Sequence, residues 1–165
     1  MGVKAAREGL FDNATCVVTP TQFSPPDAVE HLREFWQALG SKVMIMTPDQ
    51  HDELVGRSSH LVHLIAAALT KHILNPVHGP EQAALCANGF RDTTRIASGS
   101  PEMWRDIALA NQTHLQSELK SHITQLEYLS RVLEEGNAGE VERFFEQAKS
   151  LRDQWCAGGT SASPE

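Results

Sequence analysis

Two arginines four residues apart mark the segment of this sequence with the clearest chemical potential. The segment runs from Gly89 to Ala97 and reads Gly-Phe-Arg-Asp-Thr-Thr-Arg-Ile-Ala. On a helix Arg91 and Arg95 would share a face and repel each other by roughly 0.2–0.5 kcal/mol, so folding alone gives no reason to pair them. Bidentate binding of a carboxylate would be a reason. The alternative is an ordinary polar turn in which Asp92 neutralises Arg95 at i,i+3, and spacing alone favours that alternative.

Two histidines lie in the most apolar stretch, which reads Ser-His-Leu-Val-His from Ser59 to His63 and continues into leucine, isoleucine and three alanines. On a helix His60 and His63 fall on one face at i,i+3. The simplest interpretation is a pair of core histidines with satisfied hydrogen bonds. The alternative is a pair of imidazoles that line a ligand cavity as donors to an anionic or carbonyl oxygen. We predict no metal site, because zinc usually takes more ligands than these two.

Composition restricts the class of protein. A chain of 165 residues is enough for one domain with one core. Its formal net charge of −7 has no compensating basic block, so we expect small molecules or other chains as partners and no nucleic acid. The longest apolar run, residues 64–69, is far shorter than a membrane span, so no membrane partner is expected. The three cysteines form no C-x-x-C, which fits a cytoplasmic protein: Cys16, Cys86 and Cys156.

The amino-terminal part predicts a βαβ-like piece. Two short β-favouring runs, Thr15–Val18 and Lys42–Met46, flank an amphipathic segment. Its helix is expected to begin at the Ser-Pro-Pro-Asp of residues 24–27, with the Ser24 hydroxyl as cap, and to end at Gly40. We expect a buried stripe on this helix, made by Val29, Leu32, Phe35, Trp36 and Leu39. Two strands cannot make a stable parallel sheet by themselves, so this end is expected to belong to a larger sheet.

Residues after Thr47 are expected to be helical. Thr47 to Gln50 reads as a capping box that opens a helix to about Leu74, and residues 100–102 and Asn137 with Glu140 predict two further helix starts. Trp104, just inside the helix that follows the arginine segment, is by default a core aromatic.

Apolar residues at threes and fours then predict two long helices joined at Gly136. The stripes are Leu115, Leu119, Ile123, Leu126, Leu129 and Leu133, and Val141, Phe144, Phe145, Ala148, Leu151 and Trp155. Packing within the chain is the simplest explanation of these stripes, and a dimer interface is the alternative.

The fold class predicted is therefore mainly α, a helical domain preceded by a two-stranded βαβ-like piece. We expect three parts: residues 1–47, residues 48–156 and a disordered Gly/Ser/Pro-rich tail of residues 157–165. The sequence contains no nucleophile elbow G-x-S-x-G, no phosphate loop G-x-x-x-x-G-K and no dinucleotide fingerprint G-x-G-x-x-G.

Taken in order, these elements resemble prephenate dehydrogenase. The resemblance runs from about Gly2 to Trp155 and depends on Ser-His-Leu-x-His at 59–63 together with Gly-Phe-x-Asp-x-Thr-Arg-Ile-Ala at 89–97, supported by Leu10-Phe11, Val18-Thr19-Pro20, His51-Asp52 and the Met-Trp-Arg-Asp-Ile of residues 103–107. One departure is Val62, where the family usually has a proline that would kink the helix.

The resemblance implies a role in tyrosine biosynthesis. In that family a hydride passes from prephenate to NAD or NADP, and loss of carbon dioxide then gives 4-hydroxyphenylpyruvate. The family has an amino-terminal Rossmann domain and a helical domain that forms a homodimer, with the active site between them. By motif matching, Arg95 would bind a substrate carboxylate and His63 would contact the substrate. The residues implied to shape or orient that pocket are His60, Gly89, Asp92 and Trp104.

The family's dinucleotide fingerprint and catalytic His-Pro element lie upstream of the position that Gly2 matches. The resemblance therefore implies the last part of a Rossmann domain, residues 1–47, and a complete helical domain that dimerises through residues 111–155. Hydride transfer needs a bound nicotinamide and a base, so we expect this chain alone to be inactive. The alternatives are a non-catalytic dimerisation or carboxylate-binding module, and a plain helical scaffold.

Overall fold

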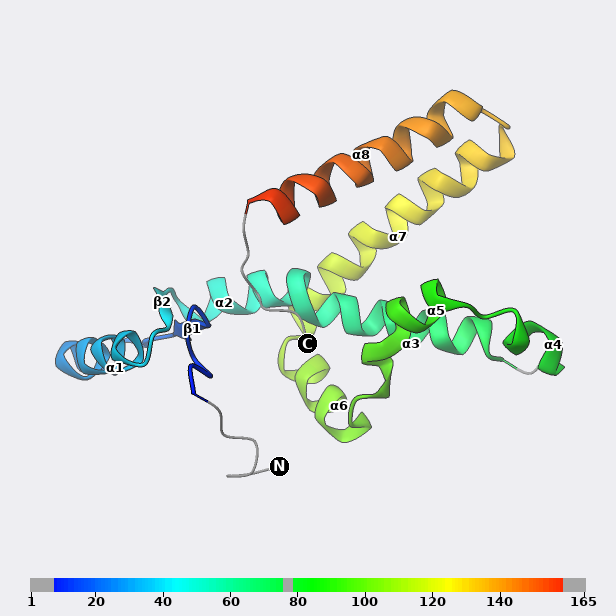
Figure 1. Cartoon of the computed structure of the whole chain (residues 1–165). Coiled ribbons are helices and arrows are strands. Elements are labelled where there is room, and N and C mark those ends of the chain that lie inside the picture. The colour runs from blue at the N-terminus through cyan, green and yellow to red at the C-terminus, as the bar shows by residue number, and fades with distance from the viewer. Residues whose placement is uncertain (1–7, 76–78, 159–165) are drawn as a thin grey trace. The chain divides into compact units, whose positions relative to one another are not determined.

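The structure, a computed structural model, describes residues 8–75 and 79–158. It divides into two compact units, Asp52–Thr124 and a unit that combines Met1–His51 with Gln125–Glu165. Helices dominate both units, and the strands found in the described ranges form one two-stranded sheet (Figure 1). The predicted mainly α fold with a βαβ-like piece is confirmed.

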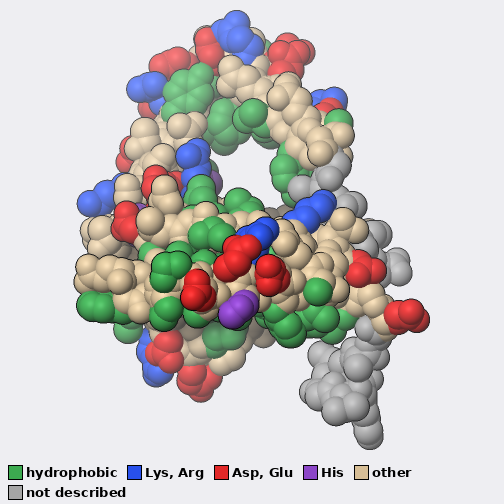
Figure 2. Space-filling model, turned by 90° about the vertical axis from the view of Figure 1, so that its left-hand side faces the viewer, with side chains coloured by type: hydrophobic (Ala, Val, Ile, Leu, Met, Phe, Trp, Pro, Cys, Tyr) green, Lys and Arg blue, Asp and Glu red, His purple; other side chains and the backbone are tan. Residues whose placement is uncertain are grey.

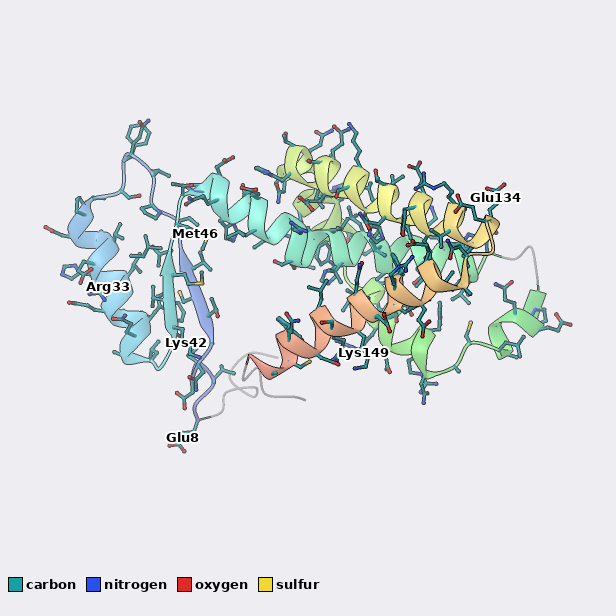
Figure 3. All side chains as sticks on the ribbon, turned by 90° about the horizontal axis from the view of Figure 1, so that it is seen from above. Glu8, Arg33, Lys42, Met46, Glu134 and Lys149 are labelled. Carbon is teal, nitrogen blue, oxygen red and sulfur yellow. The ribbon has the colours of Figure 1, made fainter. Side chains whose placement is uncertain are left out.

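The sheet consists of β1 (Thr15–Val18) and β2 (Lys42–Ile45), which pair in parallel. Thr15 is opposite Lys42 and Val18 is opposite Ile45. The connection between them is α1 (Pro26–Ala38), which Figure 3 shows beside the strands, with Arg33 on the helix and Lys42 at the start of β2. The predicted strand, helix and strand are therefore all present.

The two ends of α1 differ in how well the sequence predicted them. Pro26 stands in the first turn as expected, but the residue at the cap is Pro25, which has no side chain able to cap. The Ser24 hydroxyl instead accepts a hydrogen bond from the Thr21 backbone nitrogen at 3.0 Å, so the predicted hydroxyl cap is wrong. The helix ends as predicted at Gly40, whose φ of 89° is the left-handed conformation that glycine adopts readily.

The predicted buried stripe of α1 is only partly buried. Val29 and Trp36 are half-buried, and Trp36 makes edge-on ring contacts with Phe11 and Phe35 at centroid distances of 5.3 and 5.5 Å. Leu32, Phe35 and Leu39 are exposed. Two strands are too narrow to cover the whole apolar face of a helix. The spacing of apolar residues therefore predicts which face of α1 is turned to the sheet, but not how many of its side chains the sheet buries.

A helical run of three segments begins at Pro48. Its capping box is confirmed, because the Thr47 nitrogen donates to Gln50 Oε1 at 3.1 Å and the Gln50 nitrogen donates to Thr47 Oγ1 at 3.2 Å. The run passes through α2 (Pro48–Val55), the π-turn η2 (Gly56–His60) and α3 (Leu61–Ile73). It ends close to the predicted Leu74, and the wide turn η2 departs from regular α-helix without a proline at 62.

Four short segments follow and carry the arginines. They are α4 (Gly79–Ala84), α5 (Asn88–Thr94), the 3₁₀ turn η4 (Arg95–Ser98) and α6 (Pro101–Ala110). The predicted start of α6 is confirmed by its cap, since Ser100 Oγ accepts a hydrogen bond from the Met103 nitrogen at 3.3 Å. Segments η4 and α5 both pack on α3, which brings the arginine segment beside the histidine helix.

The carboxy-terminal helices form the predicted hairpin, α7 (Gln112–Glu134) and α8 (Ala138–Ala157), in yellow to red in Figure 1. Gly136 makes the turn with a φ of 62°, and Asn137 Oδ1 caps α8 by accepting from the Glu140 nitrogen at 3.2 Å. Most of the tail expected to be disordered, residues 159–165, lies outside the described residues, and Ala157 ends α8.

The apolar stripes of the hairpin remain largely uncovered. Leu115 is buried, and so is Val132, which the predicted stripes did not include. Hydrophobic side chains reach the surface on the upper arm in Figure 2, which α7 and α8 form. The exposed members of the stripes are Ile123, Leu126, Leu133, Phe145, Ala148, Leu151 and Trp155. Packing between α7 and α8 therefore leaves these side chains exposed. None of the helices in the described ranges has the length and apolar character needed to cross a membrane.

Candidate functional site

A cavity of about 210 Å³ lies within the unit Asp52–Thr124, where α3, η4 and the start of α6 meet. Its walls are mostly apolar, and its one imidazole and one indole come from helices far apart in sequence. The lining residues are His63, Leu64, Ala67, Ile96, Ala97, Gly99, Pro101 and Trp104. An apolar cavity with few polar groups is typical of a small-molecule site.

His63 and Trp104 form one wall of the cavity. Their rings are stacked, with centroids 3.7 Å apart and planes 25° apart, and both side chains are half-buried. His60, one helical turn before His63, meets the same indole edge-on at a centroid distance of 6.3 Å. The structure therefore brings together three of the residues that the sequence singled out.

Gly99 makes the position of Trp104 possible. A Cβ atom added to Gly99 would lie 2.5 Å from Trp104 Nε1 and 2.9 Å from Trp104 Cδ1, which no ordinary contact allows. Sequence reasoning missed Gly99, because close approach between a backbone and a ring five positions later leaves no compositional signal.

Backbone contact fixes how His63 can interact. Its Nδ1 lies 3.1 Å from the Ser59 carbonyl oxygen. A carbonyl only accepts hydrogen bonds, so Nδ1 carries the proton and donates it. In the neutral ring Nε2 is then an acceptor, and the donor role expected from the sequence requires the charged ring.

His60 contacts a buried amide that the sequence did not reveal. Asn111 is 5% exposed; its Nδ2 donates to the Asp52 carbonyl oxygen at 2.7 Å and lies 3.2 Å from His60 Nδ1. These contacts span 59 and 51 residues of sequence, so no local spacing could have predicted them.

Both arginines of the first segment are exposed. Within residues 8–75 and 79–158 no hydrogen bond or ion pair involves the side chain of Arg91, Asp92 or Arg95. The proposed neutralisation of Arg95 by Asp92 is therefore absent. The α-helix ends at Thr94 and a 3₁₀ turn begins at Arg95, which changes the regular i,i+3 spacing on which that pairing depended.

The cavity lining contains two of the six predicted site residues, His63 and Trp104. Arg95 immediately precedes Ile96 and Ala97, which do line the cavity. The remaining three predicted residues are outside the lining: His60, Gly89 and Asp92. At Gly89 an added Cβ would meet nothing within 4 Å, so packing inside the described chain does not require glycine there.

The carboxylate of Glu102 places a negative charge in the first turn of α6. Glu102 accepts hydrogen bonds from its own backbone nitrogen and from the Ser100 hydroxyl, and these contacts hold the pKa of its carboxyl below the ordinary value. In the described ranges no three His, Cys, Asp or Glu side chains are grouped so that they could hold a metal ion.

The chain is similar to known proteins over nearly its whole length. Residues 47–149 match the family model described as prephenate dehydrogenase, dimerization domain, and residues 1–50 match the one described as prephenate dehydrogenase, nucleotide-binding domain. Over 155 residues the chain is 37% identical to a prephenate dehydrogenase of Bacillus subtilis. This alignment covers 92% of this chain and 41% of the Bacillus protein.

Two solved structures are similar over 93% of this chain. One is a Synechocystis arogenate dehydrogenase, with a TM-score of 0.81, 32% identity and 56% of that chain covered. The other is a prephenate dehydrogenase from A. aeolicus in complex with hydroxyphenyl propionate and NAD+, with a TM-score of 0.84, 28% identity and 54% of that chain covered. The chain thus spans about half the length of the relatives it matches.

Proposed function

The chain belongs to the prephenate dehydrogenase family, and from that premise we propose that its helical part binds the substrate for oxidative decarboxylation of prephenate. The observation that carries this proposal is the apolar cavity walled by the stacked rings of His63 and Trp104. Arg95 directly precedes two of the residues that line this cavity, Ile96 and Ala97. Residues 48–156 would form the substrate-binding and dimerisation domain, and residues 1–47 would belong to the nucleotide-binding domain.

The cavity suits a six-membered carbon ring. An apolar cavity of about 150 Å³ holds benzene, so a volume of about 210 Å³ leaves room for a ring with short substituents. The Trp104 indole and the aliphatic residues of α3 and η4 would cover the ring. The A. aeolicus relative, whose complex contains hydroxyphenyl propionate, agrees with a ring-bearing carboxylate as ligand.

Arg95 would bind a carboxylate of that ligand. Its guanidinium is exposed and makes no ion pair within the described ranges, so it can receive an anion without first breaking a bond. His63 would contact the ligand through Nε2, the nitrogen that Ser59 leaves available. His60, Gly89, Asp92 and Trp104 would shape or orient the pocket, with Trp104 doing so through its stack on His63.

The described βαβ piece does not fit the pyrophosphate of NAD or NADP. Such a group binds at a helix N-terminus through free backbone N–H groups. The helix after β1 begins with Pro25 and Pro26, which have none, and Asp27 adds a negative charge in the first turn. The nicotinamide would supply the hydride acceptor in the family reaction.

Calorimetric titration of the 165-residue chain with prephenate, 4-hydroxyphenylpyruvate and tyrosine tests the proposal. We expect binding of prephenate that Arg95→Ala weakens by at least tenfold, since one charge-assisted contact contributes about 1.5–3 kcal/mol. Arg105→Ala is the matched control: its guanidinium is also exposed, but it pairs with Asp106 at 2.8 Å.

Equal affinity in the wild-type chain and Arg95→Ala would remove Arg95 from the site. No binding of any of the three compounds would contradict the substrate-binding role itself. Arg91→Ala separates the two arginines of the segment, and we expect it to have the smaller effect, because only Arg95 is followed directly by lining residues.

A non-catalytic carboxylate-binding module is the second candidate. Such a module needs only the apolar cavity walled by His63 and Trp104 and no bound nicotinamide. Incubation of the chain with prephenate and NAD or NADP tests this candidate in one direction: nicotinamide reduction measured by absorbance would exclude a non-catalytic module, whereas an inactive chain is expected of both candidates.

We further propose a homodimer formed through α7 and α8. The matched family model describes a dimerization domain, and the hairpin exposes apolar stripes on α7 and α8. Residues 111–155 would make most of that interface.

A further inference from the structure

Asn111 lies where α6 meets α7, and its side chain reaches the π-turn η2. It is 5% exposed, yet no role follows for it from the substrate-binding proposal. Its Nδ2 donates to the Asp52 carbonyl oxygen at 2.7 Å and lies 3.2 Å from His60 Nδ1. The amide nitrogen of Asn111 therefore contacts two residues, Asp52 in α2 and His60 in η2.

The Asp52 carbonyl decides the orientation of this amide. A carbonyl oxygen cannot donate, so the atom 2.7 Å from it must be the amide nitrogen. The reverse orientation would set two oxygens against each other and bury both N–H groups without acceptors. In the observed orientation only Asn111 Oδ1 is buried without a partner among the described residues.

The amide orientation in turn decides the tautomer of His60. Because Asn111 Nδ2 is a donor, His60 Nδ1 must accept, and a proton on Nδ1 would face another N–H group. A neutral imidazole carries one proton, so that of His60 lies on Nε2. His63 is the reverse case, since the Ser59 carbonyl requires its proton on Nδ1.

We propose that Asn111 is a positioning residue that holds His60 in the Nε2-protonated tautomer, so that the two histidines beside Trp104 carry opposite tautomers. The consequence for the ligand, which rests on the proposed function, concerns His63. In its neutral form His63 presents a lone pair at Nε2, so it accepts from a ligand hydroxyl and leaves the carboxylate to Arg95.

Gly56 gives a second, independent means of testing this contact. It is buried at the start of η2, and a Cβ there would lie 3.3 Å from Asn111 Nδ2 and 3.4 Å from His114 Cβ. Gly56→Ala would therefore press on the amide nitrogen while removing no hydrogen-bonding group. Gly139→Ala is its matched control, because the nearest atom there is 3.7 Å away.

Long-range ¹H–¹⁵N NMR of the histidine rings tests the proposal directly. The spectra are recorded on the 165-residue chain well above the ordinary histidine pKa of about 6.5, and His60→Gln and His63→Gln identify the signals. We expect the proton of His60 on Nε2 and that of His63 on Nδ1. Asn111→Asp should move the His60 proton to Nδ1, because a carboxylate only accepts, and should leave His63 unchanged. Gln112→Ala, an exposed amide next in sequence, should change neither ring.

A wild-type His60 protonated on Nδ1 would overturn the proposal, as would a cooperatively melting Asn111→Asp chain with an unchanged His60 tautomer. If Asn111→Asp does not fold, Gly56→Ala replaces it: we expect both His60 tautomers in that variant, and an unchanged Nε2 tautomer would count against the proposal. Prephenate titration of the same samples reports separately on the proposed function. Absent binding in the wild-type chain would contradict that function while the tautomer result stands.

Discussion

Gly99 approaches Trp104 so closely that a methyl group on its Cα would lie 2.5 Å from the indole Nε1. The indole meets this backbone at its Nε1 and Cδ1 atoms and stacks on the His63 ring. The cavity wall therefore depends on a residue that has no functional group.

Gly99→Ala should displace Trp104 and disrupt the stack on His63. In NMR spectra the ring protons of His63 should lose the ring-current shift caused by the indole, and prephenate affinity should fall. Gly139→Ala, with no close neighbour, should change neither quantity. A Gly99→Ala chain that keeps the His63 shift would show that the backbone moves instead of the ring.

Gly89→Ala separates a ligand role of Gly89 from a structural one. Its Cβ would meet nothing within 4 Å, and alanine is favoured over glycine in a helix, so we expect a gain of about 0.5–1 kcal/mol in the free energy of unfolding. If glycine is needed for ligand approach, prephenate affinity falls in the same variant. Denaturant melts and calorimetry on one preparation measure both, and unchanged affinity would remove Gly89 from the proposed site.

Acid should weaken the hairpin through Glu140. Its carboxylate accepts hydrogen bonds from Arg143 and Tyr128, and these lower its pKa below the ordinary 4.5. A lowered pKa means that the stabilisation is present above the ordinary pKa and is lost as the pH falls through the lowered one. The melting temperatures of the wild-type chain and Glu140→Gln should converge as the pH falls below 4.5. A difference in melting temperature between the two proteins that stays constant as the pH falls would contradict this.

High pH should weaken the same hydrogen bond through its donor, the Tyr128 hydroxyl. The Tyr128 hydroxyl donates to Glu140 Oε2 at 2.9 Å, and this bond, with burial, raises the pKa of Tyr128 above 10.0. Its stabilisation is present below the ordinary pKa and is lost as the pH rises through the raised one. Tyr128→Phe should therefore melt lower than the wild-type chain at neutral pH, and the difference should shrink at high pH. A constant difference would assign the effect to packing.

Leu151→Glu should weaken the proposed dimer. Leu151 is 69% exposed on α8, so a charge there costs the free chain little, whereas an apolar interface would have to bury it. Sedimentation velocity should show a shift from dimer to monomer. Ser150→Glu adds the same charge one position away on α8 and should shift the equilibrium less. Equal effects would indicate repulsion by charge in place of lost apolar contact.

Local chemistry explains what the sequence could predict. The capping pairs Thr47 with Gln50 and Asn137 with Glu140 act within one turn, and Gly40 and Gly136 take up the left-handed conformations that end helices. Such features depend on neighbours in sequence, so composition and spacing were sufficient. Ser24 shows the limit, because Thr21 offers its hydroxyl a competing local partner.

Long-range features of the site could not be predicted in this way. The contact between Asn111 and His60 joins residues 51 positions apart, and the closeness of Gly99 to Trp104 depends on how α6 leaves η4. Exposure of the hairpin stripes likewise depends on what lies opposite them, which periodicity does not record. The roles of Arg95 and His63 were named from the family resemblance, and their chemistry stays a prediction.

The π-turn η2 changes the direction in which the side chains of the following helix, α3, point. A π-turn holds one residue more than an α-turn, so the side chains of α3 are rotated by about 100° from where an unbroken helix would carry them. A chain with one residue fewer in 56–60 would form an unbroken α-helix and still direct His63 toward Trp104, whereas the same number of residues wound as regular α-helix would turn His63 about 100° away. The site therefore depends on residue count as well as residue type, and we expect a one-residue deletion within 56–60 to be better tolerated than one within α3.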